Sequence, residues 1–422
     1  MRMTMAINEP DFAFLPWDIP LEEWPEDLVV ALPRGISRHI VRFVRINGVV
    51  YAVKEVEELF ADREYGLLFD LQRLGVPTVE PIGVVAGRTD KASEDLPAIL
   101  ITKHLEFSLP YRALFGSSLR LDTAGRLLDA LAVLIVRLHL VGFSWNDCSL
   151  SNTLFRRDAG AFAAYLVDAE TGELHDVLSA GQREFDLETA AINVAGELLD
   201  LQMGGRLHDG IDPLVTGVSL RTRYDALWEE ITGELIISRD DRYQLEARMR
   251  RLNDLGFDVA ELQVTTQADG DHVRVQPKVV DAGHHSRRLL LLTGLDVEEN
   301  QARRLLNDLD SFRVKIGLDT DSEEVAAHRW VNERFERVMA AVPKDLRGKL
   351  EPAEIFHEVL EHRWFMSEQA LASVPFETAV AHYVLTVLPN KPDESAVLGS
   401  RIGTPSDDTG ALRIVLPPED EL

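Results

Sequence analysis

Strand patterns dominate the N-terminal quarter of this chain, and helical patterns dominate the stretch that follows. Short apolar runs separated by turn residues such as Asn47-Gly48 predict strands at residues 28–32, 39–45, 49–53, 79–85 and 98–102. Leu and Phe at helical spacing predict one helix at residues 59–74, and the charged residues 88–95 predict a mobile loop. We therefore expect an antiparallel sheet with one helix.

Longer helical patterns follow the sheet. Helices are expected at residues 122–141 and 186–202, separated by a polar loop that reaches Asn152 and a short hairpin around residues 156–164. A small sheet lobe followed by a helical lobe places a cleft between the two.

The C-terminal half has a mixed pattern. The glycine-rich residues 203–213 predict a flexible junction. Beyond it we expect helices at 240–255, on either side of Gly294, at 322–341 and at 354–369, and a hairpin of 259–265 with 273–280. The second helix near Gly294 is expected to open at Asp296 with a capping box to Glu299.

Composition excludes several classes of protein. With 44 basic and 71 acidic residues the formal charge is 44 − 71 = −27, which argues against general nucleic-acid binding. The longest apolar stretch, residues 127–143, contains charged residues and fits a buried helix, so membrane insertion is not expected. The absence of a signal-like start and the single cysteine, Cys148, predict a cytoplasmic protein, with a packed thiol favoured over a reactive one.

Polar side chains at the ends of predicted elements suggest phosphoryl transfer. This chemistry needs a cation on the phosphates of ATP, an acid that holds that cation, ligands for Mg²⁺ and a carboxylate that orients the attacking hydroxyl. The candidates are Lys54 at the end of the third strand, Glu64 in the next helix, Asp147 and Asn152 in the polar loop, and Asp168 after an apolar strand. Singly, they could be a solvated lysine, an exposed helix acid, a turn former, a cap and a loop acid. Jointly they are harder to dismiss.

This set, within Ala52-Val-Lys54 and Trp145-Asn-Asp147-Cys-Ser-Leu-Ser-Asn152, resembles the protein-kinase superfamily. In detail it is similar to the small bacterial branch of lipopolysaccharide (Kdo) and RIO-type kinases. The segments Arg63-Glu-Tyr-Gly-Leu-Leu and Leu138-His-Leu-Val-Gly-Phe-Ser-Trp add to the likeness. The resemblance covers residues 30–202, under half of the chain.

The resemblance implies an α+β fold of two lobes, a sheet lobe with one helix and a helical lobe, followed by a mainly helical α+β domain. Lys54 would contact the α and β phosphates and pair with Glu64. Asp147 would be the catalytic base, and Asn152 and Asp168 would ligate Mg²⁺.

The resemblance also implies an adenine-binding hinge at residues 101–105, which includes Thr102 and His104. In the turn before the second strand, Gly35 and Ser37 would approach the phosphates, although one glycine stands where many kinases have several. Asp186 either braces the catalytic loop or is an N-cap.

The chain departs from the kinase pattern at three places. Trp145 stands where His is usual, and Asn146 stands where regulated protein kinases carry Arg, so control by activation-loop phosphorylation is not expected. After Asp168 comes Ala169-Glu170, and the sequence leaves open whether Glu170 is a further metal ligand or a surface acid.

The C-terminal half resembles an uncharacterised domain that follows kinase-like domains in some bacterial proteins, on residues 251–257 and 292–302. That resemblance assigns no activity. The adjacent His284 and His285 are better explained by a solvated polar face than by a metal site.

These observations predict an N-terminal extension (1–26), a kinase-like domain (27–203), a linker (204–225), a C-terminal domain (226–388) and an acidic, partly disordered tail (389–422). The first hypothesis is an ATP- and Mg²⁺-dependent phosphotransferase acting on a hydroxyl of a sugar, small molecule or protein. The alternatives are a pseudokinase scaffold, whose C-terminal domain recruits a protein partner, and a nucleotidyl transferase with ATP bound in reverse.

Overall fold

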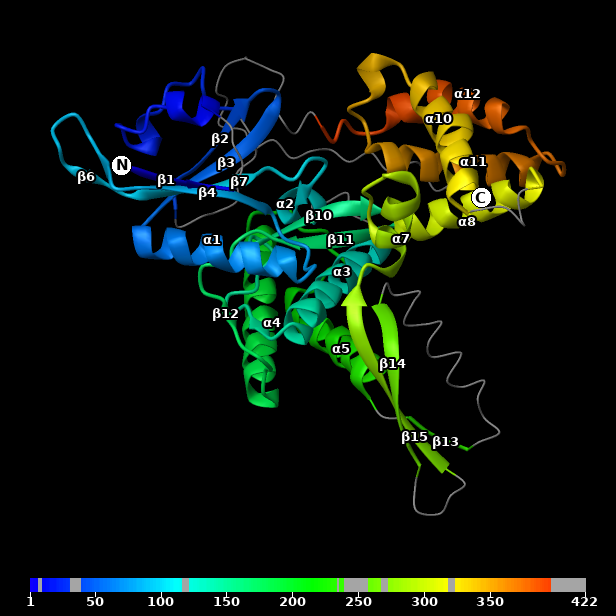
Figure 1. Ribbon diagram of the computed structural model, residues 1–422, viewed down its shortest axis with the longest axis horizontal. Helices are drawn as coiled ribbons and strands as arrows, with labels where there is room; N and C mark the ends of the chain where they lie inside the picture. The colour runs from blue at the N-terminus through cyan, green and yellow to red at the C-terminus, as the bar shows by residue number, and fades with distance from the viewer. Residues whose placement is uncertain are drawn as a thin grey trace. The chain divides into compact units, whose positions relative to one another are not determined.

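The structure is a computed structural model that describes residues 1–6, 10–30, 39–115, 121–233, 235–238, 257–266, 272–317 and 323–395 (Figure 1). The chain divides into two compact units, each described by itself. Unit 1 is Met1–Arg156, Ala164–Arg221 and Glu394–Leu422, and unit 2 is Arg157–Ala163 with Thr222–Asp393. The expected α+β fold, with an antiparallel sheet first and helices after it, is confirmed.

A five-stranded antiparallel sheet opens unit 1. Its strands are β1 (Arg2–Met5), β2 (Val41–Ile46), β3 (Val49–Val56), β4 (Glu80–Ala86) and β7 (Ala98–Lys103), in the order β1-β4-β7-β3-β2. β1 was not expected, because four residues are too few to show a pattern until they pair with β4. The expected strand at 28–32 is described as far as Val30 and contributes an isolated bridge from Val29 to Val44.

Both faces of this sheet are covered. Helix α1 (Glu58–Arg73) packs against β4 and β7. In Figure 1 it lies along one side of the sheet, and the N-terminal segment lies on the other. Phe12, Trp17, Leu21 and Trp24 of that segment are buried with sheet residues such as Val53. Burial on both faces explains why nearly every residue of β4 and β7 is buried.

The expectation of a mobile charged loop is wrong at Arg88. Arg88 is 1% exposed and begins a short ladder of β5 (Arg88–Thr89) with β6 (Asp95–Leu96). Its guanidinium donates to Glu55 Oε1 at 2.8 Å and to the carbonyls of Trp17 and Ile19. A buried arginine is tolerated here because its donors have partners of this kind.

The rest of unit 1 is mainly helical. It contains α2 (Tyr111–Leu114), α3 (Leu121–Leu140), α4 (Ala180–Met203) and the start of α5 (Pro213–Thr232), with short strands β8 (Leu109–Pro110), β9 (Phe143–Ser144), β10 (Thr153–Asp158), β11 (Ala161–Leu166) and β12 (Glu173–Leu174). The expected helix at 122–141 and the hairpin around 156–164 are confirmed.

Two expectations in this region need correction. Helix α4 begins six residues earlier than predicted, at a capping box between Ser179 and Gln182, so Asp186 is not an N-cap. Residues 213–225, expected in a linker, belong to α5. Asp212 opens that helix, because its Oδ1 accepts hydrogen bonds from the backbone N–H groups of Leu214 and Val215.

Unit 2 combines a sheet with a helical bundle. The sheet, in the order β13-β15-β14, contains β13 (Leu235–Ser238), β14 (Phe257–Thr266) and β15 (His272–Ala282). The helices are α7 (His284–Thr293), α8 (Glu299–Lys315), α9 (Glu323–Trp330), α10 (Glu336–Ala341), α11 (Pro352–Gln369) and α12 (Phe376–Thr386), around a core that includes Trp330, Phe335 and Phe356.

The predicted hairpin and most predicted helices of unit 2 are confirmed, and α12 is an addition. Helix α8 opens at Glu298 with Gln301, and not at Asp296 with Glu299, because Gln301 Oε1 accepts the Glu298 N–H. The predicted helix at 240–255, the turn at 269–270 and the tail beyond residue 395 lie outside the described residues.

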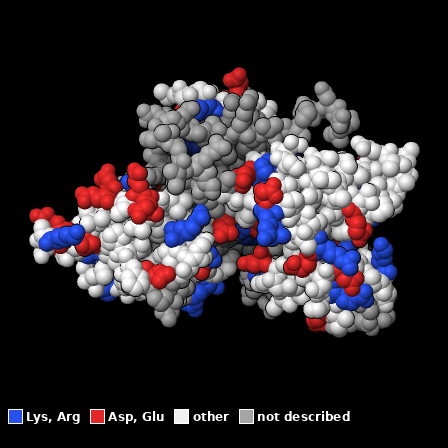
Figure 2. Space-filling model, turned by 90° about the horizontal axis from the view of Figure 1, so that it is seen from above, with Lys and Arg blue, Asp and Glu red and all other residues white. Residues whose placement is uncertain are grey.

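Acidic and basic side chains are interspersed among the described residues on the face seen in Figure 2. In the described part of the chain, no helix is long and apolar enough to cross a membrane.

Candidate active site

Strand β3 delivers Lys54 to a cluster of acids. The strand runs two residues beyond Lys54, since Lys54, Glu55 and Val56 stay paired with β7, so Lys54 lies within the strand and does not end it. Its Nζ is 2.9 Å from Glu64 Oε2 and 3.0 Å from Asp168 Oδ2, a residue 114 positions away in sequence. Glu170 Oε2 lies 3.3 Å from the same nitrogen. Long-range folding therefore brings together three of the five predicted polar side chains.

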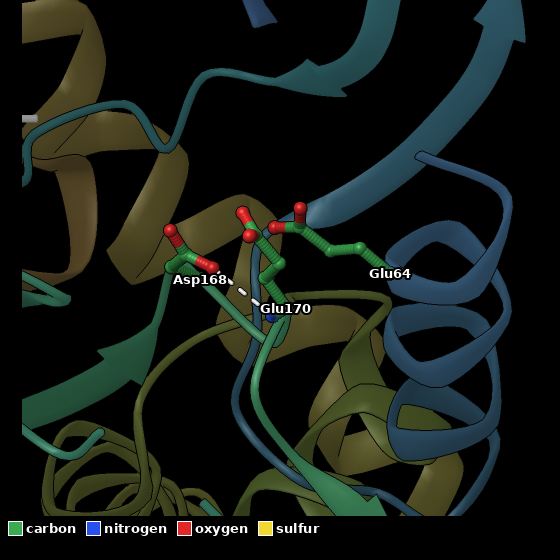
Figure 3. Close-up of side chains that lie close together, drawn as sticks. All are labelled: Glu64, Asp168 and Glu170. Atoms are coloured by element: carbon green, nitrogen blue, oxygen red, sulfur yellow. Dashed lines mark hydrogen bonds between the residues drawn. The ribbon is translucent and has the colours of Figure 1, made fainter. Parts of the chain in front are cut away.

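Glu64 is in the interior. It lies in the second turn of α1, only 1% exposed, and Figure 3 shows its carboxylate reaching from that helix toward Asp168 and Glu170. The alternative of an exposed helix acid is wrong for this residue. Asp168 and Glu170 both lie in the segment after β11, and Glu170 N–H donates to Asp168 Oδ1 at 3.0 Å.

The acids and the lysine change one another's protonation. Burial and the nearby charge of Asp168 raise the pKa of Glu64 to about 8, against the opposing effect of Lys54. Burial alone would lower the pKa of Lys54, but the charges of Glu64 and Asp168 raise it above the ordinary value. Burial also opposes ionisation of Asp168, yet Lys54 lowers its pKa. Lys54 is thus fully charged at neutral pH.

The raised pKa of Glu64 predicts a pH-dependent stability. Folded Glu64 binds a proton up to about pH 8, whereas the unfolded side chain loses it near 4.5, so the free energy of unfolding should fall as pH rises through that window. The slope from this group is at most about 1.4 kcal/mol per pH unit. Lys54 titrates above this window and Asp168 below it. Chemical denaturation of Glu64→Gln, without nucleotide or metal, should show a flatter profile.

Glu58→Gln is the matched control for that experiment, because Glu58 is an exposed acid on the same helix. It should keep the wild-type slope. Equal slopes in Glu64→Gln and the wild type would contradict the assignment of this titration to Glu64.

The polar loop after β9 places Asp147 beside two amides. Asn152 Nδ2 donates to the Asp147 carbonyl at 3.0 Å and lies 3.4 Å from Asp147 Oδ2. Asn193 Nδ2 lies 3.3 Å from Asp147 Oδ1 and 3.1 Å from the Cys148 carbonyl. These contacts hold the half-buried Asp147 carboxylate in place while part of it remains accessible.

Helix α4 braces this loop through two acids. Asp186 accepts the backbone N–H groups of Trp145 and Asn146 at 2.7 Å and lies 3.1 Å from His139 Nε2. Glu197 accepts the N–H groups of Leu150 and Ser151. Asp186 therefore has the bracing role that the sequence left open.

Sequence reasoning missed Asn193 and Glu197. The signal was present, since positions 186, 193 and 197 lie on one face of a helix at i, i+7 and i+11. This spacing identifies the residues that support the site only when the loop after β9 is known to pack on that face of α4.

Two hydrogen bonds join the loop to the segment carrying Asp168. Val167 N–H donates to the Asn152 carbonyl at 3.0 Å, and Trp145 Nε1 donates to the Asp168 carbonyl at 2.8 Å. Trp145, which replaces the usual His, is 1% exposed and fixes the backbone of Asp168. The loop and the lysine cluster thus form one continuous site within unit 1.

The donor set fits a hard divalent cation. Among the described residues, one oxygen each of Glu64, Asp168 and Glu170 lies within 4.8 Å of the others, and carboxylate oxygens are the ligands that Mg²⁺ prefers. Asn152 would bind through Oδ1, since Nδ2 bonds to Asp147. His39, which the sequence did not single out, lies 2.8 Å from Glu170 Oε2.

The structure describes two of the other residues predicted to bind the nucleotide, Thr102 and His104. Thr102 is buried on β7. Burial lowers the pKa of the His104 imidazole to about 4, and the His104 N–H already donates to the Val50 carbonyl at 2.9 Å, so an adenine would use other backbone groups of this segment. Gly35 and Ser37 lie outside the described residues.

Cys148 is buried, and burial raises the pKa of its thiol well above the ordinary value, in keeping with a packed residue. In the described part of the chain, the group of side chains that could hold a metal ion is Glu64, Asp168 and Glu170. His284 and His285 are not part of this group.

Comparison with known proteins gives two family matches. The model of the lipopolysaccharide kinase (Kdo/WaaP) family matches residues 42–191, and the model of a domain of unknown function, DUF4032, matches residues 226–388. No curated protein matches the chain. One solved structure that matches is WaaP in complex with acyl carrier protein, with 17% sequence identity, a TM-score of 0.34, and coverage of 60% of this chain and 99% of the other.

Proposed function

We propose that residues 42–191, which match the lipopolysaccharide kinase (Kdo/WaaP) family, form an ATP- and Mg²⁺-dependent phosphotransferase that acts on a hydroxyl group. The observation that supports this most directly is that Lys54 Nζ lies 2.9 Å from Glu64 Oε2 and 3.0 Å from Asp168 Oδ2. A structural ion pair would need one acid, whereas a buried lysine facing several acids suits a site that binds a phosphate and a cation.

In this proposal Lys54 binds the α and β phosphates of ATP, and Glu64 holds the lysine head in position. Asn152 and Asp168 would ligate Mg²⁺, with Glu170 as a further carboxylate at the same place. Bound Mg²⁺ neutralises phosphate charge. The chain's own contribution is to position charges in a partly buried site, where they act more strongly than in water.

Asp147 would orient the acceptor. Its carboxylate, held by Asn152 and Asn193, would accept the hydroxyl proton as the acceptor oxygen bonds to the γ-phosphorus. The bond from that phosphorus to the β–γ bridging oxygen breaks, and ADP leaves.

Parallel incubations with α-labelled and γ-labelled ATP test this proposal. A kinase transfers label only from the γ position, and the transfer should stop when EDTA removes Mg²⁺. Transfer of the α label would indicate nucleotidyl transfer instead. ATP binding without transfer to any component of a cell lysate would favour a pseudokinase scaffold.

A further inference from the structure

The β10–β11 hairpin directly connects two predicted magnesium ligands. β10 begins at Thr153, the residue after Asn152, and β11 ends at Leu166, two residues before Asp168. The Val167 N–H bond to the Asn152 carbonyl closes the base of the hairpin at 3.0 Å. The two predicted ligands therefore lie at the base of one hairpin, and the placement of the hairpin sets where both of them lie.

The tip of this hairpin, Arg157–Ala163, is part of unit 2. Asp158 is 3% exposed there, and its carboxylate meets the first turn of α8. Oδ1 accepts Gln301 N–H at 2.7 Å, and Oδ2 accepts the backbone N–H of Asn300 at 3.1 Å and its Nδ2 at 2.8 Å. An acid at these N–H groups satisfies donors that a helix leaves open and suits the helix dipole.

Two buried polar residues of unit 2, Gln301 and Glu354, form hydrogen bonds with backbone groups of the same tip. Gln301, fully buried, donates from Nε2 to the Arg157 carbonyl at 3.1 Å and to Glu354 Oε2 at 3.0 Å. Glu354 in turn accepts the Ala159 N–H at 3.0 Å. Ala159 has φ = +51°, a conformation that a residue with a Cβ rarely adopts unless its surroundings hold it.

We propose that unit 2 clamps the β10–β11 hairpin through Asp158, Gln301 and Glu354 and thereby positions Asn152 and Asp168 to bind Mg²⁺–nucleotide. This inference rests on the proposed function of the site, and it gives the domain of unknown function a specific task. Asp158 is a positioning residue in this scheme. Because Asp158 bonds to the buried Gln301 and the part-buried Asn300, its removal should free the hairpin tip from α8.

The test uses the full chain with Asp158→Ala and the milder Asn300→Ala, which removes only one side-chain donor to Asp158. Hydrogen–deuterium exchange over residues 153–166 measures how firmly the hairpin is held. Calorimetric titration with a non-hydrolysable ATP analogue at several Mg²⁺ concentrations measures how much Mg²⁺ the nucleotide site needs for binding. Asp158→Ala should speed exchange in the hairpin and raise the Mg²⁺ concentration needed for binding about tenfold, with recovery at excess Mg²⁺. Asn300→Ala should also speed exchange in the hairpin and raise the Mg²⁺ requirement, but by less than Asp158→Ala.

Asp308→Asn is the matched control. Asp308 also lies on α8 and accepts hydrogen bonds from Trp330 Nε1 and Arg334, but it does not bond to the hairpin tip. It should lower the unfolding midpoint while leaving hairpin exchange and the Mg²⁺ requirement as in the wild type. The same Mg²⁺ shift in Asp308→Asn would overturn the clamp.

The remaining outcomes separate the two proposals. Wild-type exchange and Mg²⁺ requirement in both Asp158→Ala and Asn300→Ala would overturn the clamp. If the wild-type chain does not bind the nucleotide, the proposed function fails, and the exchange measurement still decides whether unit 2 holds the hairpin. If Asp158→Ala does not fold, the two readouts of Asn300→Ala decide.

Discussion

Replacing Asp147 with Asn should lower phosphate transfer by about 100- to 10,000-fold, the usual contribution of a positioned general base. Asn has nearly the same shape, and its single amide oxygen can still accept one of the two contacts from Asn152 and Asn193, but it cannot take the acceptor's proton. The dissociation constant of ATP should change little, because Asp147 is not among the groups predicted to bind the phosphates. Steady-state turnover and calorimetric binding measure the two effects separately.

Asp176→Asn is the control for this substitution. Asp176 is an exposed acid between β12 and α4, and its replacement should leave turnover unchanged. Wild-type turnover in Asp147→Asn would contradict the assignment of the catalytic base. Equal loss of turnover and ATP binding would instead place Asp147 in the nucleotide site.

Replacing Lys54 with Met should both weaken ATP binding by more than tenfold and destabilise the fold. The substitution removes the cation from a site where Glu64 is buried and Asp168 and Glu170 are close by. Removing one partner of a buried ion pair typically costs about 3–5 kcal/mol, and here the ionised partner left behind is Asp168, because Glu64 already binds a proton below about pH 8. Denaturant unfolding and nucleotide titration measure the two losses.

Lys103→Met is the control, because Lys103 lies on the adjacent strand β7 but is 45% exposed and pairs only with the exposed Glu80 at 3.3 Å. It should cost less than about 1 kcal/mol. Adding Glu64→Gln to Lys54→Met should restore none of the ATP binding. Unchanged ATP affinity in Lys54→Met would remove Lys54 from the phosphate site.

Much of the local structure of unit 1 follows from periodicity and turn chemistry. The runs that became β2, β3, β4 and β7, and the helical spacing of α1 and α3, are visible in the sequence because each element buries a regular face. The errors occur where a local pattern competes with a distant partner. Arg88 belongs to a charged, loop-like stretch, yet it is buried against Glu55 and backbone carbonyls that come from other segments.

The sequence predicts the polar residues of the candidate site but not the residues of α4 that hold the loop in place. Lys54, Glu64 and Asp168 were chosen by residue type and position, and the structure brings them together. Glu197 and Asn193 were missed because their partners are backbone groups and amides of a loop that lies more than forty positions away. The roles of these residues in binding and catalysis stay predictions.

The sequence by itself determined most of the strands and helices and which polar groups suit phosphate and metal chemistry, because both depend on residue type and short-range spacing. Only the tertiary structure decided that Glu64 is buried beside Lys54, that α4 braces the loop of Asp147, and that the hairpin tip belongs to unit 2. Those outcomes depend on hydrogen bonds between buried acids and backbone donors that are far apart in sequence. The local pattern of residues does not specify which acid meets which donor.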